Sequence, residues 1–187
     1  MFSVVACIIS LFKVPLFFFV PMYKLDLSES IVLLSSFIMG PFCGVSTAFF
    51  KEIINILFRG TRTLFLSEFI NFFFSSILAF FCSTYIKKTN YSLKNMFVGS
   101  FIGIFVRSIL SCILNYFFII PIFSSIFLLP INKIITSANK FIPAVKNLLS
   151  FVIYIVAPFN IFKSTISCFL AIFIYKKLGK NTKIFFN

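Results

Sequence analysis

Long runs of apolar residues, separated by short polar stretches, dominate the chain. The pattern predicts helices over about residues 1–14, 28–39, 41–58, 64–86, 95–120 and 158–178. Several of these runs approach or exceed the roughly 20 residues that an α-helix needs to cross a bilayer. The sequence therefore predicts an all-α, polytopic membrane protein, built as one integral membrane domain over 1–187 with a bundle of six transmembrane helices.

The apolar segment 31–58 has two possible structures. As one straight helix it spans about 42 Å, which is longer than a hydrocarbon core of roughly 30 Å. Gly40-Pro41 in its middle is a turn signal, because a residue before proline avoids the helical conformation. The positive-inside rule mildly favours one kinked helix, whereas a hairpin gathers more polar residues at one membrane face. We favour the hairpin, turning on the cytoplasmic side.

Prolines set the other expected boundaries. Pro121 is expected to stop the helix that begins near residue 95, and Pro158 is expected to open the last helix as a first-turn residue. Between them, residues 122–157 are interpreted as a loop with one or two helical pieces. The Phe-rich link 16–20 lies between Pro15 and Pro21, so it is not expected to be one regular helix throughout.

Composition narrows the class of protein. Hydrophobic residues make up 60% of the chain, charged residues only 11%, and the mean hydropathy is +1.11. A soluble domain of this length could not bury so much apolar surface, so lipid must cover the outer faces. The net charge of +13 comes from basic residues that mostly flank apolar runs. This is the membrane pattern, and no nucleic-acid partner is expected.

The supply of chemically active side chains is small. The chain has no histidine, which removes the commonest general base and metal ligand. Its five cysteines all lie inside apolar runs, and none forms a C-x-x-C pair. We therefore expect no metal site, no catalytic residues and no cofactor. The four acids are Asp26, Glu29, Glu52 and Glu68.

Glu68, Asn71 and Asn115 are polar residues at positions where apolar ones prevail. Glu68 and Asn71 are three apart, so they share a helix face. Glu68 is either a ligand-binding carboxylate or a cap paired to Arg59 or Arg62. Asn115 either binds a ligand or makes an interhelical hydrogen bond.

Asn160 and Lys163 again lie three apart and present donors on one face of the last helix. Two such donors favour an acceptor-rich planar ligand, although Lys163 could instead extend outward to the interface. Lys51, Glu52 and Arg107 are interpreted as structural ion pairs across helices, for instance Arg107 with Glu52. In the hairpin arrangement, Asp26, Thr61, Thr63, Glu68, Asn115, Asn160 and Lys163 come near one membrane face.

Five motifs occur along the chain in this order: Lys24-x-Asp26-x-Ser28, Gly40-Pro41-x-x-Gly44, Gly60-Thr-x-Thr-x-x-x-x-Glu68-x-x-Asn71-Phe72, Asn115-Tyr116-Phe117-x-x-x-Pro121-x-Phe123 and Ala157-Pro158-Phe159-Asn160-x-x-Lys163. Together they resemble the riboflavin-binding substrate-specificity subunits, of the RibU type, of energy-coupling factor (ECF) transporters. The last three are the specific ones. The resemblance implies the S-component fold of six helices and a multi-pass protein of the cell membrane. It also implies a vitamin site open to the outside beneath the first loop.

The resemblance further implies partners and site residues. Riboflavin is the expected substrate, and the expected partners are a transmembrane coupling protein and two ATPases. Asn115, Asn160 and Lys163 are expected to contact the flavin ring, with Glu68, Asn71, Thr63 and Asp26 completing the substrate site. Ala6 and Ser10, small residues of the first helix, are expected to help dock the coupling protein.

Two other functions stay open. One is an S subunit for a different vitamin. The other is a small intramembrane enzyme that acts through Glu68, Lys163 or a cysteine. The chain has no Gly-x-x-x-x-Gly-Lys-[Ser/Thr] sequence, the phosphate-binding motif of ATPases, so an ATP site is not expected within it.

Overall fold

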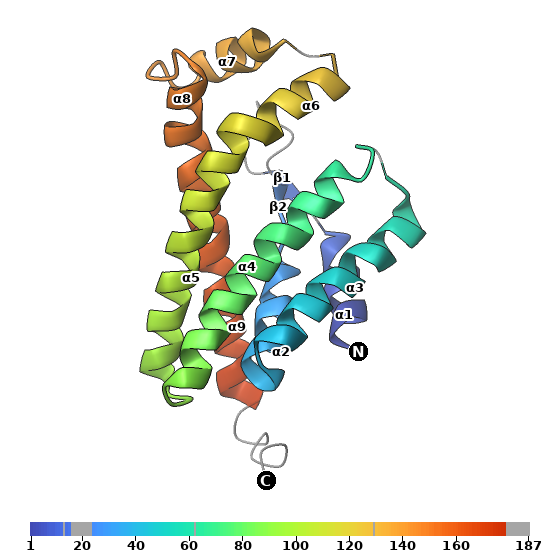
Figure 1. Ribbon diagram of the computed structural model, residues 1–187, viewed down its shortest axis with the longest axis vertical. Coiled ribbons are helices and arrows are strands. Elements are labelled where there is room, and N and C mark those ends of the chain that lie inside the picture. Colours follow the sequence, from blue (N-terminus) through green and yellow to red (C-terminus); the bar gives the residue numbers. More distant parts are fainter. Residues whose placement is uncertain (13, 16–23, 62, 129, 179–187) are drawn as a thin grey trace.

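The computed structural model describes residues 1–12, 14–15, 24–61, 63–128 and 130–178. These residues form a helical bundle (Figure 1). The α-helices are α1 (Phe2–Ser10), α2 (Glu29–Met39), α3 (Pro41–Arg59), α4 (Leu66–Lys88), α5 (Leu93–Leu114), α6 (Ile120–Ile126), α7 (Ile131–Asn139), α8 (Leu148–Phe151) and α9 (Ala157–Leu178). Two π-helical turns, η1 (Asn115–Ile119) and η2 (Val152–Val156), and two short strands, β1 (Val14–Pro15) and β2 (Lys24–Leu25), complete the order.

The hairpin predicted at Gly40-Pro41 is confirmed, and the cytoplasmic side of its turn stays a prediction. Gly40, with φ of 97°, separates α2 from α3, and Pro41 begins α3 at a position that needs no backbone N–H. This positive φ favours glycine, because a side chain would be strained there. Gly44 allows the two helices to approach, since a Cβ on it would lie 2.5 Å from the Cβ of Ser36. The hairpin therefore depends on glycine at two positions, Gly40 in the turn and Gly44 at the contact between the helices.

The boundaries expected at Pro121 and Pro158 are wrong. The helix that begins at Leu93 continues through Pro121 to Ile126, and the last helix begins at Leu148 rather than at Pro158. A π-helical turn precedes each proline, η1 before Pro121 and η2 before Pro158. A proline in a helix removes one backbone hydrogen bond and clashes with the preceding turn. The wider π turn accommodates both effects without ending the helix.

The expected first helix is also too long. α1 ends at Ser10, and Val14 pairs antiparallel with Leu25 in the short ladder of β1 and β2. The Phe-rich link 16–20 lies outside the described residues. The 122–157 segment contains most of α6 and all of α7 and α8, so it is more helical than the loop that the prolines predicted.

Four helical stretches are long and apolar enough to cross a bilayer: Pro41–Arg59, Leu66–Lys88, Leu93–Ile126 and Leu148–Leu178. Glu29–Met39 is a shorter apolar helix, and α1 is shorter still. Large apolar side chains lie exposed on the outside of the bundle, among them Phe42, Phe58 and Phe101. Lipid is the solvent that suits such a surface. The described residues thus support the membrane class, whereas the six-span count stays a prediction.

The bundle has two apolar cores. One joins α2, α3, α4, α5 and α9 around Phe37 and Leu78. The other joins α6, α7, α8, η2 and the start of α9 around Phe151 and Ile155. In Figure 1 the α2–α3 turn and the α4–α5 connection lie in the lower half, while the α3–α4 connection, the strands and α6–α8 lie in the upper half. The α2–α3 turn and the α4–α5 connection therefore lie at one end of the bundle and the other connections at the opposite end, as a hairpin at Gly40-Pro41 requires.

Candidate functional site

A layer of buried polar residues separates the two cores. On α9 it follows Phe159 of one core and precedes Cys168 of the other, and α5 repeats the pattern between Met96 and Ile120. We call this layer the polar belt; on these two helices and η1 it comprises Ser100, Arg107, Ser108, Ser111, Asn115, Asn160, Lys163, Ser164 and Ser167, all buried. The spacing of three and four residues on each helix directs them to one face, and α5 and α9 are in contact.

Several polar atoms of the belt have no hydrogen-bond partner among the described residues. They are the hydroxyls of Ser100, Ser108, Ser164 and Ser167 and the Nε of Arg107. Buried polar groups are almost always paired in proteins, so unpaired ones need an explanation. A polar ligand or water between the helices would satisfy them. The belt therefore has the donors and acceptors that a substrate site requires.

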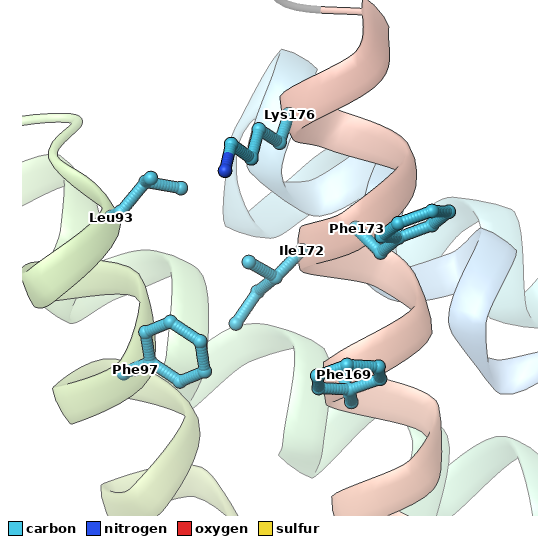
Figure 2. A pocket seen from close by; sticks show the side chains of 6 residues that line it. All are labelled: Leu93, Phe97, Phe169, Ile172, Phe173 and Lys176. Carbon is cyan, nitrogen blue, oxygen red and sulfur yellow. The ribbon is translucent and has the colours of Figure 1, made fainter.

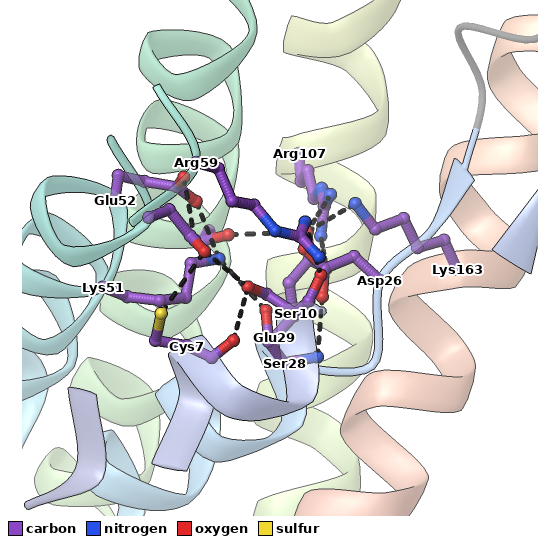
Figure 3. A network of polar contacts seen from close by, with 12 residues as sticks. Cys7, Ser10, Asp26, Ser28, Glu29, Lys51, Glu52, Arg59, Arg107 and Lys163 are labelled. Carbon is purple, nitrogen blue, oxygen red and sulfur yellow. Dashed lines mark hydrogen bonds and ion pairs between the residues drawn. The ribbon is translucent and has the colours of Figure 1, made fainter. Parts of the chain in front are cut away.

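Three charged residues form the centre of the belt, the Glu29 triad. The Arg107 guanidinium donates two hydrogen bonds to the Glu29 carboxylate, from Nη1 to Oε2 at 2.7 Å and from Nη2 to Oε1 at 3.0 Å. Lys163 Nζ lies 2.7 Å from the same Oε1. All three side chains are buried, so the triad ties α2, α5 and α9 together (Figure 3). Two buried cations need such a carboxylate, because an unpaired buried charge is costly.

A second charged group lies beside the triad. Lys51 Nζ is 2.8 Å from Glu52 Oε1 and donates a hydrogen bond to the Ser28 hydroxyl at 3.1 Å. We call Lys51 and Glu52 the α3 pair. The expected pairing of Arg107 with Glu52 is wrong, because Arg107 binds Glu29 and Lys51 takes Glu52. Arg107 thus forms the ion pair across helices that was predicted, but with Glu29, whereas Lys51 and Glu52 pair within α3.

Asn115 and Asn160 lie at the π-helical turns. Asn115 begins η1, and its Nδ2 donates to the backbone oxygen of Ser111 at 2.8 Å. Asn160 lies one turn after η2 and donates from Nδ2 to the backbone oxygen of Val156 at 2.9 Å. Both amides are buried, and η1 contacts η2. The two asparagines thus lie near contacting π-helical turns, Asn115 within η1 and Asn160 after η2, at the border of the belt.

Lys163 follows Asn160 by one turn of α9. Its ammonium lies against Glu29 instead of extending outward to the interface. Among the predicted substrate residues, Asn115, Asn160 and Lys163 are therefore the ones that α5, η1 and α9 hold in or beside one buried layer.

The Glu68 group lies at the start of α4. The hydroxyls of Thr61 and Thr63 lie 3.4 and 3.5 Å from Glu68 Oε2. Thr61 also accepts the backbone N–H of Phe65 at 2.8 Å. Glu68 is half-buried, and so is Asn71 one turn later. These contacts fit a carboxylate that stabilises a helix start; Arg62, one of its proposed partners, lies outside the described residues.

Asp26 is buried at the loop before α2. Its Oδ1 accepts the backbone N–H of Ser28 at 2.9 Å, which fixes the turn that leads into Glu29. Asp26 appears with the Glu29 triad and the α3 pair in Figure 3. It therefore lies beside the polar belt.

Ala6 and Ser10 are fully buried within the chain. The Ser10 hydroxyl donates to Asn55 Oδ1 at 2.7 Å, and Cys7 Sγ lies 3.4 Å from the same oxygen. Both contacts attach α1 to α3. A partner protein could reach these two side chains only if α1 moved, and their docking role stays a prediction.

Glu29 is the residue that sequence reasoning missed. The sequence assigns it no role beyond its place among the four acids, although it is the counter-ion of two buried cations. The signal was present in the charge count: Arg107 and Lys163 both lie in apolar helices, and only four acids exist to pair with them. Because Glu29 and Arg107 are 78 positions apart in sequence, a local pattern does not reveal their pairing.

An apolar pocket of about 220 Å³ lies away from the belt, between α5 and the end of α9 (Figure 2). Its lining is Leu93, Phe97, Phe169, Ile172, Phe173 and Lys176. Substrate sites normally combine an apolar lining with several convergent polar groups. This pocket offers one lysine, so the polar belt is the better candidate site.

Comparison with known proteins identifies the architecture. A family model described as "ECF transporter, substrate-specific component" matches residues 1–175. This chain belongs to that family. Its substrate-specific components are multi-pass proteins of the cell membrane that work with an ECF energising module, which agrees with the helical bundle and its apolar outer surface.

Two individual proteins are similar to this ECF substrate-specific component. "Riboflavin transporter RibU" of Staphylococcus aureus (strain TCH60) is 29% identical over 183 residues, which cover 98% of this chain and 89% of that protein. A solved structure titled "Structure and mechanism of the S component of a bacterial ECF transporter" matches with a TM-score of 0.72 and 26% identity, over 96% of this chain and 92% of that one. The expected S-component fold is thereby confirmed.

Proposed function

We propose that this chain is the riboflavin-binding subunit of an ECF transporter. It captures the vitamin from outside the cell and delivers it through an energising module of one transmembrane coupling protein and two ATPases. The support is the likeness to a protein named as a riboflavin transporter over nearly the whole chain, together with the buried amides and ammonium of the polar belt. Riboflavin is the transported substrate in this proposal and not a cofactor.

The observation that carries the proposal is the set of three buried donors, Asn115, Asn160 and Lys163. A flavin ring is planar and apolar on both faces, and its pyrimidine edge has carbonyl acceptors and one imide N–H. Carboxamides can match both kinds of group, and an ammonium can match the acceptors. Donors from two neighbouring helices at one level suit a flat ligand that enters between them.

The remaining predicted residues have secondary roles in the proposal. Glu68, Asn71 and Thr63 at the start of α4 lie nearer the ribityl hydroxyls. Asp26 holds the loop that leads to Glu29. Transport then needs no reaction at the substrate, and the site requires only binding groups.

The test is riboflavin fluorescence quenching with the detergent-purified protein. We expect saturable quenching at one riboflavin per chain and no chemical change of the vitamin. Other vitamins are then added as competitors. If they do not displace the bound riboflavin, the protein is distinguished from an S subunit for a different vitamin. A flavin product that differs from riboflavin would instead indicate an enzyme. Absence of quenching would contradict the proposal.

A further inference from the structure

Lys163 is held in place by two other side chains. Its Nζ lies 2.7 Å from Glu29 Oε1. Arg107 contacts both oxygens of that carboxylate, at 2.7 and 3.0 Å. The planar guanidinium therefore fixes the plane of the carboxylate, and the carboxylate fixes the ammonium (Figure 3). Ser75 of α4 adds a longer contact, 3.4 Å from its hydroxyl to Glu29 Oε1.

This arrangement removes a cost of binding. A lysine has a flexible four-carbon stem, and a ligand that immobilises it loses affinity to the entropy of that stem. Here Glu29 orders the stem before any ligand arrives. An ammonium has three N–H donors, and the Glu29 contact uses one of them. Two donors remain to point at a ligand.

The triad also selects the kind of ligand group. Its two cations share the Glu29 carboxylate, and ammonium and guanidinium groups can only donate hydrogen bonds. A ligand edge that is rich in hydrogen-bond acceptors suits these donors, whereas a cationic group is disfavoured. The unpaired Nε of Arg107 adds a further donor at the same place.

We infer that Glu29 and Arg107 are positioning residues for substrate binding. They act through Lys163, which they hold so that its ammonium meets the acceptor edge of the bound ring. The inference rests on the proposed function, since it takes riboflavin as the ligand and Lys163 as a contact.

A double-mutant cycle on the full-length protein in detergent tests the inference. One arm removes the Glu29–Arg107 pair as Glu29→Gln with Arg107→Gln, which leaves the net charge of the triad unchanged. The other arm is Lys163→Met. Riboflavin affinity is measured by fluorescence titration for the wild type, for each arm and for both arms combined. Gel filtration of each variant checks that it is folded.

We expect loss of the pair to weaken riboflavin binding about tenfold when Lys163 is present, and less than about twofold when Lys163 is methionine. A purely structural role of the pair predicts the same loss in both backgrounds, and that result would overturn the inference. Unchanged affinity without the pair, or without Lys163, would also overturn it while leaving the proposed function intact. If the wild type itself does not bind riboflavin, both the proposed function and the inference fail.

Two further variants keep the test decisive. If the paired glutamine variant does not fold, Arg107→Lys keeps the charge but loses the two-pronged contact with Glu29. Arg107→Lys should weaken riboflavin binding about threefold when residue 163 is lysine, and should not weaken it when residue 163 is methionine. An equal effect in both backgrounds overturns the inference.

The matched control is Lys51→Gln with Glu52→Gln, which removes the neighbouring buried pair at constant net charge. This control should leave riboflavin affinity unchanged, and a loss as large as that of the Glu29–Arg107 arm would contradict the assignment.

Discussion

The Glu29 triad and the α3 pair are two groups of buried charges that lie side by side, yet they join different parts of the bundle. Lys51 and Glu52 are adjacent in sequence, and their other contacts reach Ser28 and Asn55. The Glu29 triad joins three helices across the polar belt, and Asn160 lies one turn from it. Buried ion pairs therefore have two uses in this bundle. The α3 pair attaches the start of α2 to α3, and the Glu29 triad forms part of the candidate substrate site.

The comparison predicts that the largest loss of stability follows Glu29→Gln. This change removes the carboxylate that pairs with both Arg107 and Lys163, whereas Glu52→Gln removes one that pairs with Lys51 alone. Breaking a buried ion pair costs about 3–5 kcal/mol, and Glu29→Gln should lie at the upper end. The thermal denaturation midpoint of each variant in detergent measures the loss. Equal midpoints for the two variants, or a lower midpoint for Glu52→Gln, would contradict the difference between the two groups.

A smaller effect is expected on the α3 side. Asn55→Ala removes the acceptor of the Ser10 hydroxyl, a contact of 2.7 Å that attaches α1 to α3. Loss of a buried hydrogen-bond partner costs about 1–3 kcal/mol. The denaturation midpoint should fall accordingly, while riboflavin affinity should stay at the wild-type value. A variant that is stable but binds riboflavin weakly would show that the α3 side belongs to the substrate site.

The smallest effect is expected at the end of α1. The Arg59 guanidinium donates to the backbone oxygens of Ser10 and Leu11, at 3.4 and 3.0 Å. A cation at a helix C-terminus contributes about 0.3–1 kcal/mol. Arg59→Gln should lower the denaturation midpoint slightly and leave binding unchanged. The same measurement at high salt should show a smaller difference, because salt screens an exposed charge; an unchanged difference would exclude the electrostatic explanation.

The prolines show how far local sequence predicts this fold. Gly40-Pro41 marks a turn because glycine supplies the positive φ and proline suits the first turn of α3. Pro121 and Pro158 look like boundaries by the same rule, but π-helical turns allow both helices to continue. Whether a proline ends a helix depends on packing of the neighbouring helices, which a local pattern does not contain.

The candidate site shows the same limit. The spacing of Asn160 and Lys163 placed both on one helix face, and the structure has both buried on α9. The partner of Arg107 could not be read from spacing, because Glu29 and Glu52 were both available and lie 78 and 55 residues away in sequence. Pairing over such separations is decided by the packing of α2 against α9 and of α9 against α5, and only the folded bundle distinguishes the two acids.

Riboflavin titration of Asn115→Ala, Asn160→Ala and Lys163→Ala tests the central claim most directly. Each substitution removes a buried hydrogen-bonding group, which costs about 1–3 kcal/mol, or roughly five- to a hundredfold in affinity. We predict that all three variants remain monodisperse in gel filtration and bind riboflavin more weakly by factors in that range. Wild-type affinity in all three variants would contradict the site, and the family likeness would then support only the fold.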